Sequence, residues 1–179
     1  MIEVKDEILL DRLKNGDIEI LGTLYERYKK QIFNHFLRCT RDYDLSNDLL
    51  METFERVYKY CHSFNLSKKV RPWIFQIAVN LLKDTYKTSN RFESIDKTKV
   101  TYTIEAQDTS IDESYKHKQL YNALDQLDPY QRNIISMYYL LEMSYEDIAT
   151  TENMSINNAR IKVCRSLKKL KEILKDLEL

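Results

Sequence analysis

Glycine and proline are nearly missing from this 179-residue sequence. Glycine occurs only at Gly16 and Gly22, and proline only at Pro72 and Pro129. Residues that interrupt helices are therefore rare, which favours long helices and an all-α fold. The scarcity of glycine also excludes phosphate-binding loops of the Walker and Rossmann types, because these loops need glycine where the backbone approaches a phosphate.

The sequence also lacks the features of a secreted or membrane protein. Cys39, Cys61 and Cys164 are too scattered for a disulfide framework or paired zinc ligands, and an odd number suits a reducing compartment. No apolar run approaches the roughly 18 to 20 residues that span a membrane. The first residues are charged rather than built like a signal peptide. We therefore expect a cytoplasmic protein without membrane insertion.

Recognisable catalytic arrangements are missing as well. A carboxylate-bridged metal site in a helical bundle would need Glu-x-x-His pairs, and none of the three histidines has a glutamate three residues before it. No Ser/His/Asp or Cys/His arrangement can be nominated from the sequence. We expect no enzymatic activity, no cofactor and no metal site. The formal net charge is zero, so any polyanionic partner must be sought in the charge of individual segments.

The first half has the residue spacing of a helical bundle. Apolar residues recur at three- and four-residue intervals over residues 17–41, which predicts a long helix after a shorter one near residues 5–14. This stripe comprises Leu21, Leu24, Tyr25, Tyr28, Ile32 and Phe36. Asp44 or Ser46 is expected to cap a third helix, which should end near His62.

A fourth helix is expected to end the first domain. Pro72 stands where a first helical residue is favoured, and the helix should end near Thr88. Its predicted apolar side consists of Trp73, Ile77 and Leu81. Between residues 93 and 113, six acidic residues accompany two lysines and the periodicity disappears. We therefore predict two small helical domains, residues 1–91 and 114–179, joined by a flexible acidic linker at 92–113.

The second half predicts a helix-turn-helix. Helix starts are marked by Asp128 followed by Pro129, by Ser144 and by Ser155. Ala149 is small enough for two helices to cross closely, and Asn153, four residues later, tolerates the left-handed backbone of the turn. The core between the two helices is expected to contain Ile148, Met154, Ile156, Ala159 and Val163.

The last helix is strongly basic. Between residues 160 and 175, seven lysines and arginines stand against the single acidic residue Glu172. A basic helix in a helix-turn-helix is typical of DNA binding, although an amphipathic terminal helix with a solvated charged face would have a similar sequence. The DNA-binding residues expected here are Ser155, Asn157, Asn158, Arg160, Ile161, Lys162, Arg165, Lys168 and Lys169.

Two segments of the first half resemble a known family. Residues 44–58, DLSNDLLMETFERVY, and residues 71–80, RPWIFQIAVN, followed by Asp84, closely resemble the second conserved region of extracytoplasmic-function (ECF) sigma factors of bacterial RNA polymerase. The helix-turn-helix is similar to their fourth region, so the resemblance covers nearly the whole chain in the right order. It implies a sigma factor that binds core RNA polymerase, directs it to promoters and promotes DNA strand opening.

The resemblance also implies where the polymerase binds. In the family, the helix that matches residues 48–58 docks on the clamp helices of the polymerase, and the helix at residues 128–141 contributes to the flap site. The clamp-binding residues so implied are Asp48, Leu49, Glu52, Glu55 and Arg56. The flap-binding residues are Tyr130, Arg132, Ile135 and Tyr139. The family also makes an anti-sigma factor an expected partner.

The minus-ten promoter element is opened in the family by the loop and helix that match residues 62–87. Aromatic side chains among cations suit the capture of unstacked bases and their phosphates. The residues implied are Phe64, Lys68, Lys69, Arg71, Asn80, Lys83 and Lys87. We expect Phe64 to lie in a loop with too few apolar neighbours to form a core, whereas Trp73 is as good a candidate for the core as for DNA.

The chain departs from the family in this helix, and a rival interpretation stays open. Gln76 and Val79 stand where arginine is frequent, and Lys87 where arginine is common, so fewer cations face the DNA. The alternative is a DNA-binding regulator whose N-terminal bundle senses a ligand or dimerises. Polymerase distinguishes the two, because a regulator binds duplex operator by itself and a sigma factor binds promoters tightly only with core enzyme.

Overall fold

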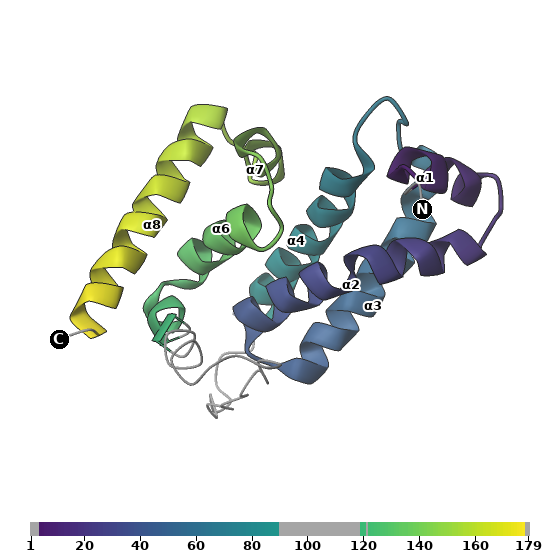
Figure 1. The fold of residues 1–179 in the computed structure, drawn as a ribbon. Coiled ribbons are helices and arrows are strands. Elements are labelled where there is room, and N and C mark those ends of the chain that lie inside the picture. Colours follow the sequence, from purple (N-terminus) through teal and green to yellow (C-terminus); the bar gives the residue numbers. More distant parts are fainter. Residues whose placement is uncertain (1–3, 90–118, 121, 178–179) are drawn as a thin grey trace. The chain divides into compact units, whose positions relative to one another are not determined.

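The computed structural model of the chain describes residues 4–89, 119, 120 and 122–177. The chain divides into two compact units, Met1–Lys99 and Val100–Leu179, coloured purple to teal and green to yellow in Figure 1. Among the described residues both units contain helices and turns but no strand, so the predicted all-α class is confirmed. The predicted linker at 92–113 lies outside the described residues.

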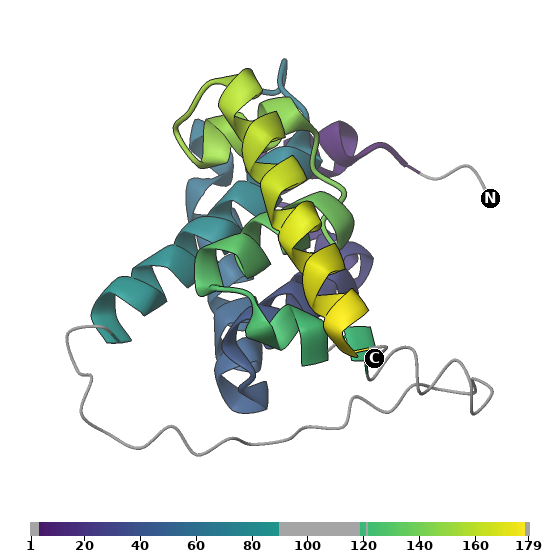
Figure 2. The same cartoon turned by 90° about the vertical axis from the view of Figure 1, so that its left-hand side faces the viewer.

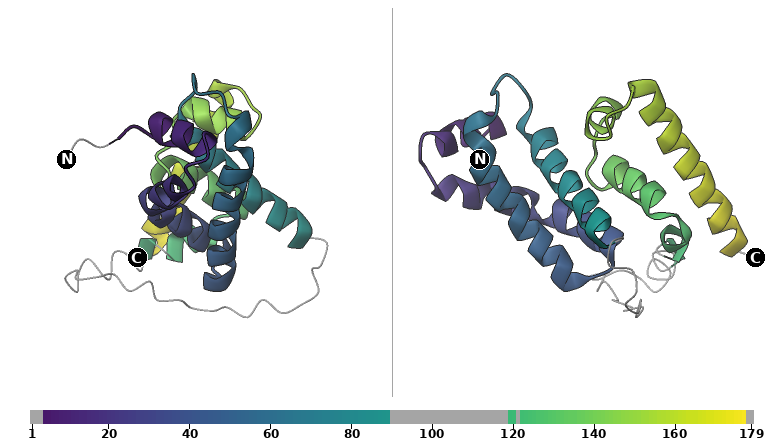
Figure 3. Two further views of the ribbon diagram at one scale, coloured as in Figure 1. Left: turned by 90° about the vertical axis from the view of Figure 1, so that its right-hand side faces the viewer. Right: turned by 180° about the vertical axis from the view of Figure 1, so that it is seen from behind.

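The first unit is a bundle of four helices. In chain order they are α1 (Asp6–Lys14), α2 (Glu19–Thr40), α3 (Tyr43–Tyr60) and α4 (Val70–Ser89), with the short 3₁₀ helix η1 (Cys61–Ser63) after α3. The long helix α2 lies beside α3, as the view from behind in Figure 3 shows, and α4 packs against α3. These boundaries agree with the predicted helices within about two residues, a margin usual for helix ends.

The sharp turn from α2 to α3 depends on two residues. Arg41 ends α2 in the left-handed conformation, with a φ of 59°. The next residue, Asp42, caps α3 by accepting a hydrogen bond from the backbone N–H of Leu45 at 2.9 Å. The predicted caps Asp44 and Ser46 are therefore wrong. Ser46 is buried inside the third helix, where its hydroxyl donates to the Asp42 carbonyl.

The core of the first unit is built from one side of each helix. Leu24, Tyr28, Ile32 and Phe36 of the predicted stripe on α2 are buried. On α4, Leu81 is buried as predicted, but Trp73 and Ile77 are half-buried. The buried side of this helix consists mainly of Ile74, Phe75, Ala78, Val79 and Leu82. Between residues 70 and 82, α4 is apolar at all positions except Arg71, Gln76 and Asn80, so its spacing alone does not decide which side faces the core.

A buried histidine makes the stability of this unit depend on pH. His35 of α2 is fully buried, and burial lowers its pKa from 6.5 to about 3. The folded protein therefore keeps the imidazole neutral, while the unfolded chain binds a proton below about pH 6.5. This contribution is fully present above that pH and is lost as the pH falls, by about 1.4 kcal/mol per pH unit.

We expect the His35→Leu variant to lose this part of the acid dependence. The difference in unfolding free energy between wild type and variant, measured by urea titration from pH 7 to pH 4, should change by about 1.4 kcal/mol per unit below about pH 6. The exposed His62 provides the matched control, since His62→Gln should keep the wild-type slope. A His35→Leu curve parallel to wild type would contradict the expectation.

The second unit contains three labelled helices. A short helical segment at residues 122–126 precedes α6 (Pro129–Tyr139), α7 (Tyr145–Thr151) and α8 (Ile156–Leu177). The long helix α8 packs against both α6 and α7 (Figures 1 and 2). The C-terminal half of α8 contributes to a hydrophobic core that consists of Leu120, Ala123, Leu124, Leu127, Ile135, Leu170, Ile173 and Leu174.

The predicted caps and turn of the helix-turn-helix are present. Asp128 accepts a hydrogen bond from the N–H of Gln131, Ser144 forms a capping box with Asp147, and the Ser155 hydroxyl accepts from the N–H of Asn158. Asn153 has a φ of 52°, the left-handed conformation expected of the turn. Local hydrogen bonds thus set where α6, α7 and α8 begin.

One predicted member of the helix-turn-helix core is wrong. Ile148, Ala159 and Val163 are fully buried and Met154 is half-buried, but Ile156 is 48% exposed. Ile156 is the first residue of α8, directly after the cap residue Ser155. An apolar side chain at that place is available to a partner rather than to the core.

Candidate nucleic-acid interface

The last helix presents a broad exposed face. Its buried residues, Ala159, Val163, Ser166, Leu170 and Ile173, recur every three or four positions and lie on one side. At about 100° per residue, Asn157, Ile161, Arg165 and Lys168 fall on the opposite side. All nine residues predicted to contact DNA from this helix and its cap are exposed: Ser155, Asn157, Asn158, Arg160, Ile161, Lys162, Arg165, Lys168 and Lys169.

Two cations at the flanks of this face lie over tyrosine rings. The Arg160 guanidinium is 5.5 Å from the ring centre of Tyr145, and the Lys162 amine is 4.8 Å from that of Tyr130. Tyr145 in turn stacks on Tyr138, with ring centres 5.2 Å apart. A hydrogen bond with Tyr138 is the main cause that raises the pKa of Tyr145. Cation–π contacts of this kind restrict where the two charges point.

The loop between η1 and α4 differs from its prediction. Lys68 and Lys69 are exposed, as a nucleic-acid contact requires, but Phe64 is only 7% exposed. Its ring packs on Trp73, with ring centres 4.7 Å apart. The expectation that Phe64 lies outside the core is therefore wrong: Trp73, which is half-buried, is the ring of this pair that reaches the surface.

The predicted residues of α4 are separated into two groups. At about 100° per residue, Trp73, Asn80, Lys83 and Lys87 lie within about 80° of one another around the helix. Asn80 and Lys87 are exposed, and the Lys87 amine is 3.5 Å from the Asp84 carboxylate. Arg71 lies on the opposite side of α4, with its guanidinium 5.0 Å from the ring centre of Phe75.

The outer face of α3 is acidic around an apolar ridge. Asp48 and Glu55 are exposed, and Arg56 forms an ion pair with Glu52 at 2.7 Å. Leu49 is 4% exposed and belongs to the core, so this conformation gives it no surface for a partner. The sequence interpretation missed two exposed apolar residues here, Met51 and Tyr58. Both lie outside the buried side of α3, which is formed by Leu49, Leu50, Thr53, Phe54 and Val57. An apolar residue away from the apolar stripe of a helix is the signal that could have revealed them.

The residues suggested for a flap site on α6 also divide. Tyr130 and Tyr139 are exposed, but Ile135 and Arg132 are buried. The Arg132 guanidinium donates to the carbonyls of Leu124, Asp125 and Leu127 at 3.0, 2.9 and 3.2 Å. These are carbonyls at the end of the helical segment that precedes α6, so Arg132 satisfies acceptors that a helix end leaves open.

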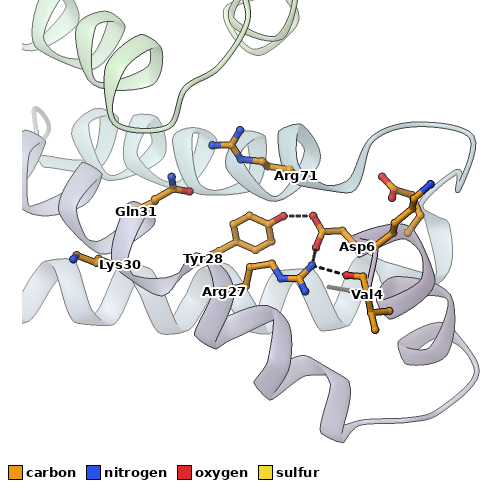
Figure 4. A pocket seen from close by; sticks show the side chains of 9 residues that line it. Val4, Asp6, Arg27, Tyr28, Lys30, Gln31 and Arg71 are labelled. Carbon is orange, nitrogen blue, oxygen red and sulfur yellow. Dashed lines mark hydrogen bonds and ion pairs between the residues drawn. The ribbon is translucent and has the colours of Figure 1, made fainter. Parts of the chain in front are cut away.

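A pocket lies between α1, α2 and α4 of the first unit (Figure 4). Asp6 of α1 accepts hydrogen bonds from the Arg27 guanidinium and the Tyr28 hydroxyl of α2. Burial, followed by this contact with Asp6, raises the pKa of Tyr28. Arg71 faces the pair across the pocket in Figure 4. The network fastens α1 to α2.

Metal-ligating clusters and membrane spans were sought in the described parts of the chain. In residues 4–89, 119, 120 and 122–177, no three His, Cys, Asp or Glu side chains gather into a group that could hold a metal ion. None of the helices in these ranges is both long enough and apolar enough to cross a membrane.

Two family descriptions match the chain, one in each unit. "Sigma-70 region 2" matches residues 24–92, and "Sigma-70, region 4" matches residues 117–170. Together the matches cover more than half of the sequence. The chain belongs to the sigma-70 family. The basic face of α8 thus belongs to region 4 of this sigma factor, and α3 and α4 belong to region 2.

Curated relatives place the sigma factor in the ECF group. It is 28% identical to the ECF RNA polymerase sigma factor SigM of Bacillus subtilis (strain 168), over 86% of this chain and 94% of SigM. It is 25% identical to the RNA polymerase sigma factor CarQ of Myxococcus xanthus, over 95% of this chain and 98% of CarQ. Membership of the ECF group replaces the alternative interpretation, a DNA-binding regulator whose N-terminal bundle senses a ligand or dimerises.

Two solved structures share the fold. One is CnrH, solved in complex with the cytosolic domain of CnrY, with a TM-score of 0.71 and 19% identity over 96% of this chain and 97% of CnrH. The other is the sigma factor RpoE of Bartonella quintana, solved with the anti-sigma factor NepR. Its TM-score is 0.70 and its identity 21%, over 86% of this chain and 97% of RpoE.

Family membership defines the activity. The protein is a DNA-binding transcription initiation factor that directs RNA polymerase to specific promoters. Strand opening at the promoter is a general function of sigma factors. Exposed cations are present in both family regions, on α8 in region 4 and at Lys87 of α4 in region 2.

Proposed function

We propose that the two units of this sigma factor divide promoter recognition between them. Residues 1–91 bind the polymerase clamp and the minus-ten element, residues 114–179 bind the minus-thirty-five element, and residues 92–113 connect the two. The observation that carries the proposal is the exposed basic face of α8. The opposite side of this helix packs against α6 and α7 in a capped helix-turn-helix. Such a helix fits the major groove, where base edges can be distinguished.

Residues along α8 should differ in what they contact. Arg160 and Ile161 lie in the first two turns, near the end of the recognition helix that meets base edges in helix-turn-helix proteins. Exposed Ile161 and Ile156 offer apolar contact to thymine methyl groups. Lys168 lies about 12 Å further along the helix than Arg160, where a single charge suits a phosphate.

The minus-ten contact is assigned to one side of α4 and the preceding loop. Asn80, Lys83 and Lys87 share a side with the half-exposed ring of Trp73, and Lys68 and Lys69 extend from the loop. An aromatic surface beside cations suits an unstacked base and its phosphate. The buried Phe64 contributes indirectly, because its ring packs on Trp73. Arg71 lies on the other side of α4 and packs on Phe75.

The polymerase contact is assigned to the outer face of α3. This face combines Asp48, Glu52, Glu55 and Arg56 with exposed Met51 and Tyr58. Apolar side chains surrounded by charges are the composition of protein interfaces. On α6, Tyr130 and Tyr139 are exposed and remain candidates for the flap contact.

Two further properties follow from kinship with other sigma factors. RpoE of Bartonella quintana was solved with an anti-sigma factor, and we propose that a partner of this type also holds the present protein inactive. The protein is proposed to act in the cytoplasm, where a bacterial sigma factor meets RNA polymerase and the chromosome. Reconstitution tests the central proposal: the purified chain should copurify with core polymerase and support run-off transcription from its promoter, while the chain alone should bind the same duplex weakly.

Charge removal on α8 should separate recognition of sequence from attraction to phosphate. Arg160→Ala and Arg165→Ala should reduce discrimination between matched and mismatched promoters, since a bidentate contact to guanine is worth about 1–3 kcal/mol. Lys168→Ala should weaken all sequences alike and lower the salt slope of binding by about one unit.

The readout for α8 is holoenzyme binding to matched and mismatched promoters over a range of salt concentrations. Lys29→Ala on α2 removes the same charge from a half-exposed side chain in the other unit and should behave as wild type. Equal loss of sequence preference in the arginine and lysine variants would contradict the assignment.

A further inference from the structure

The loop between η1 and α4 is fastened at both ends to α1. At its start, the Lys14 amine donates a hydrogen bond to the carbonyl of Phe64 at 3.0 Å, across 50 residues of sequence. At its end, the backbone N–H of Val70 donates to the Glu7 carboxylate at 3.4 Å, across 63 residues. The helix α1 also packs against both η1 and α4.

Glu7 and Lys14 are spaced to hold both ends at once. They lie seven residues apart and therefore project from the same side of α1, about 10 Å from each other along its axis. Leu9, Leu10 and Leu13 of the same helix are buried in the unit. Asp6 ties α1 to Arg27 and Tyr28 of α2 (Figure 4). The helix that holds the loop is thus itself fixed.

The loop between these two points has an ordered turn. The side chain of Asn65 accepts a hydrogen bond from the N–H of Ser67 at 2.9 Å, and the Asn65 carbonyl accepts one from the N–H of Lys68 at 3.0 Å. Asparagine commonly forms turns of this kind. Lys68 and Lys69 follow directly and are exposed. Their backbone is therefore set before any partner arrives.

We propose that Lys14 and Glu7 are positioning residues for strand opening. They hold residues 64–70 in the conformation that receives the unstacked bases and phosphates of the minus-ten element, without touching DNA themselves. The proposal rests on the function assigned above to this loop. A loop that is ordered in advance loses less conformational entropy when it captures the strand, so more of the binding energy is available to offset unstacking.

The test compares opening of duplex promoter with transcription from pre-opened promoter. Lys14→Met and Glu7→Met remove the donor and the acceptor but keep the length of the side chain. In the reconstituted holoenzyme, each should lower permanganate reactivity of promoter thymines about 3- to 10-fold, the range of one hydrogen bond. Run-off from templates already mismatched across the minus-ten element should equal wild type, and so should polymerase binding.

Conservative variants and an unrelated lysine serve as controls. Lys14→Arg keeps a donor and Glu7→Gln keeps an acceptor, so both should open duplex promoter nearly as wild type does. Lys29→Met, at a half-exposed lysine of α2 that pairs with Glu26, should have no effect. Circular dichroism and a melting curve verify that each variant is folded.

A variant of the loop itself separates the role of the loop from the role of Lys14 and Glu7. If Lys68→Ala with Lys69→Ala impairs opening and the two methionine variants do not, the inference about α1 is overturned and the role of the loop stands. If the double lysine variant opens duplex promoter normally, the assigned role of the loop fails and the inference fails with it. Methionine variants that lose folding or polymerase binding together with opening would also overturn it, because the contacts would then stabilise the whole unit.

Discussion

Replacing Phe64 by alanine should strongly destabilise the first unit rather than produce a stable protein that only fails to open promoters. The ring is 7% exposed and packs on Trp73 at 4.7 Å. Removing a buried phenylalanine side chain costs about 3–5 kcal/mol, because the apolar contact is lost and a cavity remains. A domain of this size has a total stability of only about 5–15 kcal/mol.

The expected result is a large loss of thermal stability with a parallel loss of polymerase binding. Urea unfolding followed by circular dichroism measures the first effect, and copurification with core polymerase the second. Phe64→Leu is the control, since it keeps most of the buried volume and should cost less than about 1.5 kcal/mol. A Phe64→Ala protein as stable as wild type, but selectively defective on duplex promoter, would show that the ring acts on DNA after all.

The burial of Phe64 illustrates what the sequence could not show. The loop has few apolar neighbours along the chain, which suggested an exposed ring, but its packing partner Trp73 comes from the next helix. Likewise the Lys14 and Glu7 contacts join residues 50 and 63 positions apart. Contacts of this kind depend on how helices assemble, and no local pattern records them.

Local rules, by contrast, predicted the second unit well. The caps at Asp128, Ser144 and Ser155 and the left-handed turn at Asn153 are all present. Each is decided by hydrogen bonds or backbone conformation within about four residues, so the sequence contains the necessary information. The cap of α3 was predicted wrongly. Asp42, Asp44 and Ser46 are all residue types that suit a cap, and the left-handed turn at Arg41 determines that Asp42 is the one used.

Surface and core were hardest to separate in segments with many apolar residues. Leu49 resembles a contact residue by its place in the family pattern but is buried, while Met51, two positions later, is 54% exposed. Neighbouring positions on a helix differ by about 100°, so a small error in the assumed side exchanges interior for surface. On α8 the charged residues remove most of this ambiguity: all nine residues predicted for its DNA-binding face are exposed, and Ile156, placed in the core, is the exception.

Arg132 gives the second large expected effect, and it too corrects a surface assignment. Its guanidinium donates to three carbonyls, those of Leu124, Asp125 and Leu127, and only 7% of the residue is exposed. Arg132→Met keeps the aliphatic stem but removes the donor to all three carbonyls, of which that of Leu124 also accepts from the N–H of Leu127 at 3.3 Å. A hydrogen bond to a charged group contributes about 1.5–3 kcal/mol, and a buried acceptor left unsatisfied costs about 1–3 kcal/mol, so we expect a total loss of about 3–5 kcal/mol.

The geometry of the guanidinium explains why lysine should not restore this stability. Arginine spreads five N–H donors over a planar fork, which lets one side chain reach carbonyls at the end of the helical segment that precedes α6, whereas lysine offers a single ammonium. Arg132→Lys should therefore recover less than half of the loss, while Tyr139→Ala, at an exposed position of the same helix, should change stability by less than about 0.5 kcal/mol.

Urea unfolding of the full chain measures the three variants together, and the transition of the second unit should carry the change. Because α8 packs on α6, loss of this support should also remove promoter binding by the recognition helix. An Arg132→Met protein with wild-type stability and a specific loss of polymerase binding would contradict this prediction and support a direct contact of Arg132 with the polymerase flap.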